Sequence, residues 1–216
     1  MSYNKKEINK LNNISFGDIL IFDENLAAVH AYLCADGYVV RNPHTQIHKY
    51  YRIALRNTNI ILLKDFQDRF EEYFGIKPIL KEGQRCIVHS KELYHKLIKQ
   101  FVSFYSWEWR MPNLSKENMK FWLRAFFDCE GYVEVQKGKS RTVRLECVNK
   151  IGLESVRSAL MKHFDIESSI KDRKGRNIMR LSICGKDDLL KFRKEIGFLH
   201  PAKSKKLEEA IGSFKK

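Results

Sequence analysis

The stretch LRAFFDCEGYVEV (residues 123–135) joins a nearly continuous apolar run to two acids, a glycine and an alternating segment. The apolar run predicts a buried helix, and the alternation after Gly131 predicts a strand with one apolar face. A glycine in this position commonly ends a helix, so we expect the turn at Gly131. Asp128 and Glu130 would then lie at the tip of the helix.

The same pattern occurs earlier in the chain, in LAAVHAYLCADGYVV (residues 26–40), where Asp36 and Gly37 correspond to Glu130 and Gly131. Two further markers recur in the same order. FGI (residues 74–76) corresponds to FDI (residues 164–166), and KELYHKL (residues 91–97) corresponds to KDDLLKF (residues 186–192). Three markers at nearly constant spacing indicate a duplicated unit. Small differences in spacing predict a longer first hairpin in the first unit and a longer second hairpin in the second.

Each unit is predicted to contain helix, two strands, helix, two strands and helix, so the fold class is α+β with two tandem αββαββα repeats. Period-two patterning with one apolar face indicates antiparallel sheets packed on helices. We expect residues 1–103 to hold the first repeat and an N-terminal extension, in which DILIF could add a strand. Residues 104–116 would be a linker with packed aromatic residues. Residues 117–216 would hold the second repeat and a C-terminal tail, and this tail is predicted to be a short helix without a catalytic role.

Net charge indicates the class of partner. Lysine and arginine total 40 against 26 acids, which gives a net charge of +14 and favours a polyanion such as nucleic acid. No apolar run is long enough to span a membrane, and the lysine-rich N-terminus has no secretory signal. The five cysteines form no CxxC pair, which favours buried reduced thiols over a zinc site. We expect an intracellular, cytoplasmic protein that acts on nucleoid DNA.

Small residues recur at helical spacing in the two helices that open the repeats. Ala31 and Ala35 in the first, and Ala125 and Cys129 in the second, would let the helix backbones approach closely. Side-by-side packing would bring Asp36 and Glu130 to the same end, where two carboxylates repel unless a cation separates them. Oxygen ligands favour Mg²⁺, and Mg²⁺ beside basic sheets predicts phosphodiester cleavage. The alternative is that both acids merely end helices at the surface.

The segments VHAYLCADG (residues 29–37) and LRAFFDCEG (residues 123–131) resemble the two motifs of single-chain LAGLIDADG homing endonucleases. The resemblance extends over roughly residues 25–196. It implies a saddle of two antiparallel sheets around a central pair of packed helices. It also implies that a monomer cleaves both strands of a long asymmetric duplex. The cofactor would be Mg²⁺, as two or three divalent ions, with Mn²⁺ or Ca²⁺ as substitutes.

The resemblance also assigns residues to the site. Asp36 and Glu130 would bind the metal, each followed by a motif glycine, Gly37 and Gly131. Ala31, Ala35, Ala125 and Cys129 fall on the motif's packing positions. Asp128 falls on the motif's earlier acid, which is usually not a ligand, so we expect it to be incidental. After the second strand of the second repeat, Asn149 and Lys150 match the polar residues of the family's catalytic centre. The first repeat offers asparagines there but no lysine, so the centres are expected to differ.

Basic side chains on the outward strand faces and hairpin tips are the candidate DNA contacts. Arginine can bind guanine through two hydrogen bonds, whereas lysine mainly contacts phosphate. The predicted set comprises Arg52, Arg56, Arg85, Lys137, Lys139, Arg141, Arg144, Lys171, Arg173, Lys174, Arg176 and Arg180.

Two other functions are possible on the same scaffold: an RNA maturase, or a DNA-binding protein that does not cleave. The sequence favours the nuclease because both motif acids are retained. The chain begins with methionine and has no protein-splicing segments, so we expect a free-standing, intron-encoded product.

Overall fold

The computed structural model describes residues 19–43, 45–136, 140–173, 175 and 177–214. The first repeat contains α2 (Glu24–Cys34), β1 (Gly37–Arg41), β2 (Tyr51–Arg56), α3 (Ile60–Phe74), β3 (Ile79–Lys81), β4 (Arg85–Val88) and α4 (Lys91–Phe101). The second contains α5 (Lys116–Glu130), β5 (Gly131–Gln136), β6 (Ser140–Cys147), α6 (Lys150–Phe164), β7 (Ser169–Asp172), β8 (Met179–Cys184) and α7 (Lys186–Glu195). The predicted αββαββα order is confirmed in both repeats.

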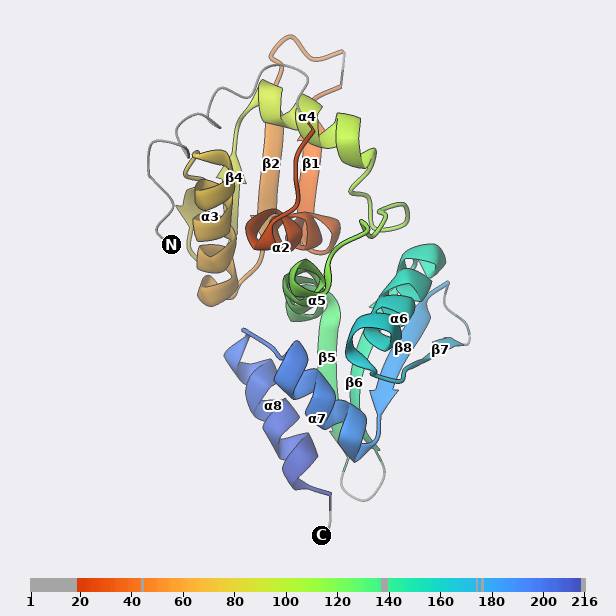
Figure 1. Cartoon of the computed structure of the whole chain (residues 1–216). Coiled ribbons are helices and arrows are strands. Elements are labelled where there is room, and N and C mark those ends of the chain that lie inside the picture. Colours follow the sequence, from red (N-terminus) through yellow and green to blue (C-terminus); the bar gives the residue numbers. More distant parts are fainter. Residues whose placement is uncertain (1–18, 44, 137–139, 174, 176, 215–216) are drawn as a thin grey trace, which may run out of the picture.

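Each repeat forms one antiparallel sheet, with strand orders β1-β2-β4-β3 and β5-β6-β8-β7. The two sheets lie on either side of the central helices α2 and α5, and the remaining helices cover one face of each sheet (Figure 1). The first hairpin connection spans residues 42–50 in the first repeat but 137–139 in the second. The second connection spans residues 82–84 and then 173–178, so both predicted length differences are confirmed.

Helix starts follow side-chain capping. Asp23 accepts a hydrogen bond from the Leu26 amide at the start of α2, and Ser115 caps α5 in the same way. Asn59 and Asn149 occupy equivalent places, because each caps the helix that follows the second strand of its repeat. The duplication therefore extends to the capping residues.

The core lies where α2 and α5 pack side by side (Figure 1). Ala31 and Ala125 are buried between the helices, as their spacing predicted. The indole Nε1 of Trp122 in α5 donates a hydrogen bond of 3.0 Å to Nδ1 of His30 in α2. This contact joins the repeats through a buried polar pair.

The segment between the repeats packs as expected through Trp109, whose ring contacts Trp122 and Phe126. Tyr105 and Trp107 from the same segment are instead exposed and stack on each other with ring centroids 4.8 Å apart. Phe104 is buried against His30 and Phe101, so the expectation of packed aromatic residues holds for two of the four in this segment.

The segments before and after the repeats are tied to the repeats. Residues 19–23 form no strand, so the strand expected from DILIF is absent; instead, the Gln100 side chain bonds both the N–H (2.7 Å) and the C=O (2.8 Å) of Leu20. The side-chain amide takes the place of a neighbouring strand. The predicted terminal helix is α8 (Pro201–Gly212).

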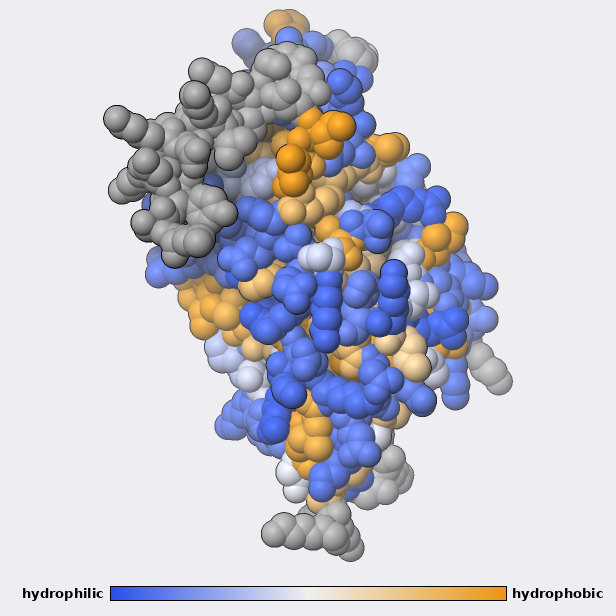
Figure 2. Space-filling model, in the orientation of Figure 1, coloured by the Kyte–Doolittle hydropathy of each residue, from blue (hydrophilic) through white to orange (hydrophobic). Residues whose placement is uncertain are grey.

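The face of the molecule in Figure 2 is mostly hydrophilic. Hydrophobic side chains gather over the segment before α2, where Ile19 and Ile21 are exposed. Within the described residues, no helix is both long enough and apolar enough to cross a membrane. The cysteines are unpaired, but only Cys34 and Cys86 are buried; Cys129 and Cys147 are half-buried and Cys184 is exposed, which corrects the expectation that all five are buried.

Candidate metal centre and nucleic-acid interface

The two motif acids lie together at the adjoining ends of α2 and α5. Asp36 follows the last turn of α2, and Glu130 is the last residue of α5. Burial and, to a smaller extent, the nearby negative charge of Asp36 together raise the pKa of Glu130 to about 7. The thiol of the half-buried Cys129, in the last turn of α5, also interacts with the Asp36 carboxylate. The structure therefore brings together the acids that the sequence analysis paired.

Gly37 and Gly131 allow each strand to start directly against its helix. A Cβ on Gly37 would lie 2.5 Å from the Leu33 Cα, and one on Gly131 would lie 2.6 Å from the Phe127 carbonyl oxygen. Gly131 has φ −82° and ψ 155°, so the left-handed conformation expected of a helix-ending glycine is not what this position requires. The glycines are needed for close approach of the backbone.

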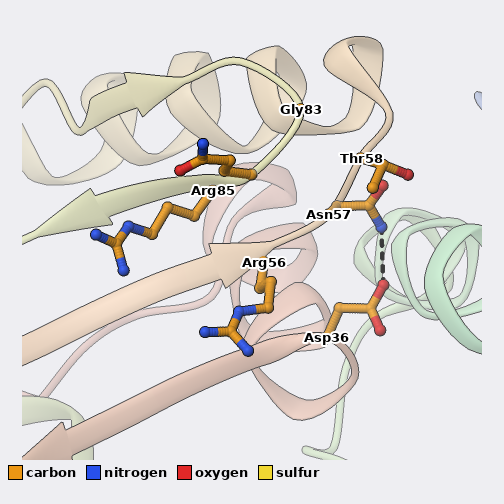
Figure 3. A pocket seen from close by; sticks show the side chains of 7 residues that line it. Asp36, Arg56, Asn57, Thr58, Gly83 and Arg85 are labelled. Carbon is orange, nitrogen blue, oxygen red and sulfur yellow. Dashed lines mark hydrogen bonds between the residues drawn. The ribbon is translucent and has the colours of Figure 1, made fainter.

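The Asp36 carboxylate lies at the edge of an open cavity of about 530 Å³ in the first repeat. Asn57 Nδ2 donates a hydrogen bond of 2.8 Å to Asp36 Oδ2 (Figure 3). The Arg56 amide donates one of 3.1 Å to the Asp36 carbonyl. Asn57 therefore orients the carboxylate. Sequence reasoning noted asparagines in this turn but did not select Asn57.

The equivalent place in the second repeat holds different chemistry. Gly37 pairs with Leu55 and Gly131 pairs with Leu145, so Asn57 corresponds to Cys147. The pKa of the Cys147 thiol is raised by burial and also by the charge of Glu130. A thiol therefore replaces the orienting amide. The two centres differ at this position through Asn57 and Cys147, whereas the sequence-based prediction attributed their difference to Lys150.

Asp128 is not incidental, which corrects the sequence-based expectation. Its carboxylate is buried and accepts hydrogen bonds from the amides of Leu199 (3.0 Å) and His200 (2.9 Å), directly before α8. Burial raises the pKa of Asp128 to about 6, although these bonds and nearby positive charges oppose the rise. Asp128 thus anchors the C-terminal helix.

Lys203 of α8 is a site residue that the sequence analysis missed. Its Nζ donates to the carbonyl oxygens of Asp128 (2.6 Å) and Cys129 (3.2 Å) at the end of α5. Burial lowers the pKa of Lys203, while the charges of Cys129, Asp128, Asp36 and Glu130 oppose that change. The tail, which was expected only to form a short helix without a catalytic role, therefore places one side chain at the end of α5.

Asn149 and Lys150, the expected catalytic pair, have other positions. The Asn149 side chain accepts a bond from the Gly152 amide (2.9 Å) and donates one to the Trp109 carbonyl (2.7 Å). These bonds give it a capping role, and none of its contacts supports catalysis. The signal was available, because Asn149 is a favoured helix-capping residue placed like Asn59. Lys150 is exposed at the first position of α6.

The candidate DNA contacts of the first repeat are free to bind anions. Arg52 lies over the Tyr50 ring at 5.3 Å, while Arg56 and Arg85 face each other across β2 and β4. Among the described residues, no carboxylate lies within ion-pair distance of these three arginines. The buried Nε of Arg85 has no hydrogen-bond partner there either. Like charges on facing strands repel, so this pair favours an external anion.

In the second repeat, the candidate contacts are neutralised within the protein, which sequence reasoning did not foresee. Arg144 pairs with Glu134 at 2.7 Å, and Arg180 and Arg173 both pair with Glu146. The remaining candidates differ among themselves: Arg141 bonds to Ser213, Lys171 is exposed, and Lys137, Lys139, Lys174 and Arg176 lie outside the described residues.

The donor set fits a hard divalent cation. The described residues contain no cluster of three or more His, Cys, Asp or Glu side chains able to hold a metal. Asp36 and Glu130 alone would supply protein carboxylates. Mg²⁺ is often held by one or two carboxylates together with waters and substrate phosphates, so this pair suits it. The mutual repulsion of the carboxylates would be relieved by such an ion.

Three comparisons bear on the family. Residues 117–197 match the LAGLIDADG-like domain model. The replication factor C small subunit of Thermococcus kodakarensis is 32% identical over 108 residues, which are 49% of this chain and 11% of that protein. The chain therefore spans about a tenth of the curated relative.

Among solved structures, the homing endonuclease I-DmoI in complex with DNA and Mn has a TM-score of 0.57 at 19% identity, covering 79% of this chain and 97% of I-DmoI. The N-terminal LAGLIDADG domain of DUF199/WhiA has a TM-score of 0.53 at 16% identity, covering 89% and 91%. The second repeat is therefore a LAGLIDADG-like domain, and the whole chain has the two-repeat LAGLIDADG fold.

Proposed function

We propose that this protein is a site-specific, metal-dependent endonuclease of the homing type that cleaves both strands of a long duplex DNA target. The observation that carries the proposal is the placement of Asp36 and Glu130 together at the adjoining ends of α2 and α5, between the two sheets. The structurally similar I-DmoI has been solved in complex with DNA and with Mn, Mg or Ca, which supports the use of a divalent metal.

Each group near the acids has a proposed task. Asp36 and Glu130 would hold Mg²⁺, which when bound supplies activation of water and stabilisation of the leaving oxygen. Asn57 holds the Asp36 carboxylate in orientation through its 2.8 Å bond. Arg56 and Arg85, beside the same cavity, would hold backbone phosphates close to the acids. The outward faces of the two sheets would lie along the duplex.

The remaining features of the proposal rest on the sequence and on the family. The protein would act as a monomer, with one centre for each DNA strand, and Mn²⁺ or Ca²⁺ could replace Mg²⁺. It would be intron-encoded and would meet its target inside the cell, on nucleoid DNA.

The test is to incubate the full chain with Mg²⁺ and a library of randomised duplex DNA, and then to sequence the cut ends. We expect cuts within one long asymmetric sequence. Asp36→Asn and Glu130→Gln should bind that sequence without making a double-strand cut. Equal cleavage by both variants and the wild type would remove the proposed mechanism.

A second candidate is a DNA-binding protein that does not cleave. The similarity to the WhiA domain favours it, because the same fold occurs there in a protein not described as an endonuclease. Selection of bound rather than cut DNA from the same library separates the two: enrichment without cut ends would support the second candidate. The RNA-maturase alternative finds no support in the comparisons reported above.

A further inference from the structure

The C-terminal helix α8 is fastened to the second repeat at both ends. The buried Asp128 carboxylate binds the two amides that precede α8. Beyond the other end, Arg141 Nε donates 2.5 Å to the Ser213 hydroxyl, and its Nη2 donates 2.9 Å to the Ser213 carbonyl. Between these points α8 packs against β5, β6 and α7. The position of Lys203, one turn into α8, is therefore fixed by the fold.

The ammonium of Lys203 lies at the negative end of α5. The last carbonyls of a helix have no partner within the helix and carry partial negative charge. The last turn of α5 contains no basic residue of its own. Lys203 supplies the missing donor to the carbonyls of Phe127 (3.4 Å), Asp128 (2.6 Å) and Cys129 (3.2 Å).

The same ammonium lies close enough to both motif acids for their charges to act on it, although within the described part of the chain it forms no ion pair with either carboxylate. The charges of Asp36 and Glu130 act on Lys203, and Lys203 in turn favours the ionised form of Glu130. Lys205 and Lys206, on the same helix, are exposed. Burial therefore selects one lysine of α8 for the centre and leaves the others in solvent.

The first repeat has no equivalent of this lysine within the described residues. Its opening helix α2 also lacks a basic residue in its last turn. The helix that completes the first repeat, α4, is followed by the segment that leads into α5 and not by a helix like α8. One cation therefore serves two carboxylates, and it comes from outside both repeats.

We propose that Lys203 is a positioning residue of the metal centre: its ammonium is the resident cation of the metal-free protein and sets the affinity of the centre for divalent ions. This inference rests on the proposed function, because it takes Asp36 and Glu130 as metal ligands. The ammonium holds the two carboxylates together before a metal arrives. It also repels the arriving ion, so the charge of Lys203 should weaken metal binding.

The test measures Mn²⁺ binding to the full chain without DNA, by calorimetry. Lys203→Gln keeps an N–H donor for the α5 carbonyls but loses the charge, whereas Lys203→Arg keeps both. Lys206→Gln makes the same charge change at an exposed site of the same helix. We expect Lys203→Gln to bind Mn²⁺ about tenfold more tightly, since a nearby unit charge is removed. Lys203→Arg and Lys206→Gln should stay close to the wild type.

Thermal unfolding separates positioning from support of the fold. Without metal, Lys203→Gln should melt at a lower temperature than the wild type, and added Mn²⁺ should raise its melting temperature by more. A lower melting temperature with an unchanged Mn²⁺ affinity would make Lys203 a structural residue and overturn the inference. If Lys203→Gln does not fold, the NMR signal of the wild-type Lys203 ammonium decides: it should shift on addition of Ca²⁺, and an unmoved signal would overturn the inference.

Failure of this inference differs from failure of the proposed function. If the wild type binds Mn²⁺ and Asp36→Asn does not, the metal centre stands whatever Lys203 does. If neither the wild type nor any variant binds Mn²⁺, the proposed function fails together with the inference.

Discussion

The two repeats place their motif acids in the same way but surround them with different arrangements of charge. Arg56 faces Arg85 in the first repeat, and at the same register Glu146 faces Arg180 in the second. The first repeat thus keeps unpaired positive charge beside Asp36, whereas the second neutralises its arginines internally. Duplication has preserved the backbone of the site while the chemistry of its two halves has diverged.

This difference assigns the halves different tasks. A pair of facing guanidinium groups repels until an anion binds between them, so the first repeat is the stronger phosphate-binding half. In the second repeat, the ion pairs stiffen the sheet, and Lys203 supplies charge from α8. We therefore expect the first repeat to provide more of the DNA affinity.

The largest predicted effect tests whether the two acids act as separate centres. Asp36→Asn and Glu130→Gln should each lower double-strand cleavage about 10³-fold, because each removes a carboxylate ligand of the Mg²⁺ that would stabilise the charge of the reacting state. If each acid serves its own strand, one variant should nick the strand that the other leaves intact. Denaturing gels with separately labelled strands measure this. Identical loss on both strands in both variants would show that the acids form a single shared centre.

The next prediction exchanges the chemistry between the halves. Arg56→Glu builds into the first repeat the Glu–Arg pair of the second, and should weaken DNA binding roughly 10- to 100-fold at moderate salt. The dependence of binding on salt should also become less steep.

The stability of Arg56→Glu serves as an internal control. Because Arg85 gains a partner, the melting temperature should not fall. Arg157→Glu, which removes an exposed arginine of α6 paired with Glu154, should bind DNA almost normally. Equal loss of affinity in the two variants would mean that net charge alone governs binding.

A smaller effect is expected at the anchor that exists only in the second repeat. Asp128→Asn keeps one acceptor but turns an amide group toward an N–H donor, and should lower the free energy of unfolding by about 1–2 kcal/mol. Hydrogen exchange should increase in α8 and remain unchanged in α3 and α4. Faster exchange throughout both repeats would contradict a local anchor.

The last prediction concerns the pH dependence of the contact between the central helices, which does not change the stability at neutral pH. Burial lowers the pKa of His30 to about 3, because its ring is enclosed by Phe22, Phe101, Phe104 and Trp122. The unfolded chain binds the proton near pH 6.5 and the folded chain does not. Stability from neutral His30 is therefore complete above pH 6.5 and is lost as the pH falls towards 3.

The expected loss is about 1.4 kcal/mol per pH unit. Unfolding by urea at several pH values measures it, and His30→Gln should remove this component. Subtracting the free energy of unfolding of the variant from that of the wild type cancels the contributions of the carboxyl groups. These include Glu130, whose raised pKa makes folding more favourable as the pH falls. An unchanged pH dependence in His30→Gln would show that the imidazole is protonated in the folded protein.

The features that could be predicted from the sequence are those that depend on a local residue pattern and occur in both repeats. Helix and strand order, the close helix pair and the two acids follow from periodicity, small-residue spacing and the second copy. Asn149 could also have been recognised, because asparagine before a helix with an equivalent in Asn59 indicates a cap. The family resemblance predicts a catalytic role for Asn149 instead.

The missed features depend on contacts between distant segments. Nothing near Lys203 in the sequence shows that it lies at the end of α5, because the path of α8 is set by Asp128 and Arg141. Alternation indicated that Glu134 and Glu146 share a face with arginines, but which charges meet depends on strand register. Gly131 was predicted to end the helix because glycine tolerates a positive φ. In the structure its φ is ordinary, and glycine is required because a Cβ would collide with the Phe127 carbonyl oxygen.

Trp109 has a consequence for recombination among proteins of this fold. Its ring fills a space that any side chain on Gly152 would obstruct at 2.5 Å, and its carbonyl accepts the bond from Asn149. Although it precedes α5, it belongs structurally to the second repeat. A chimaera joined at the start of α5 would separate Trp109 from Gly152 and Asn149 of the same protein. A chimaera joined just after α4 would keep Trp109 together with these two residues, so the exchangeable module is longer than the repeat.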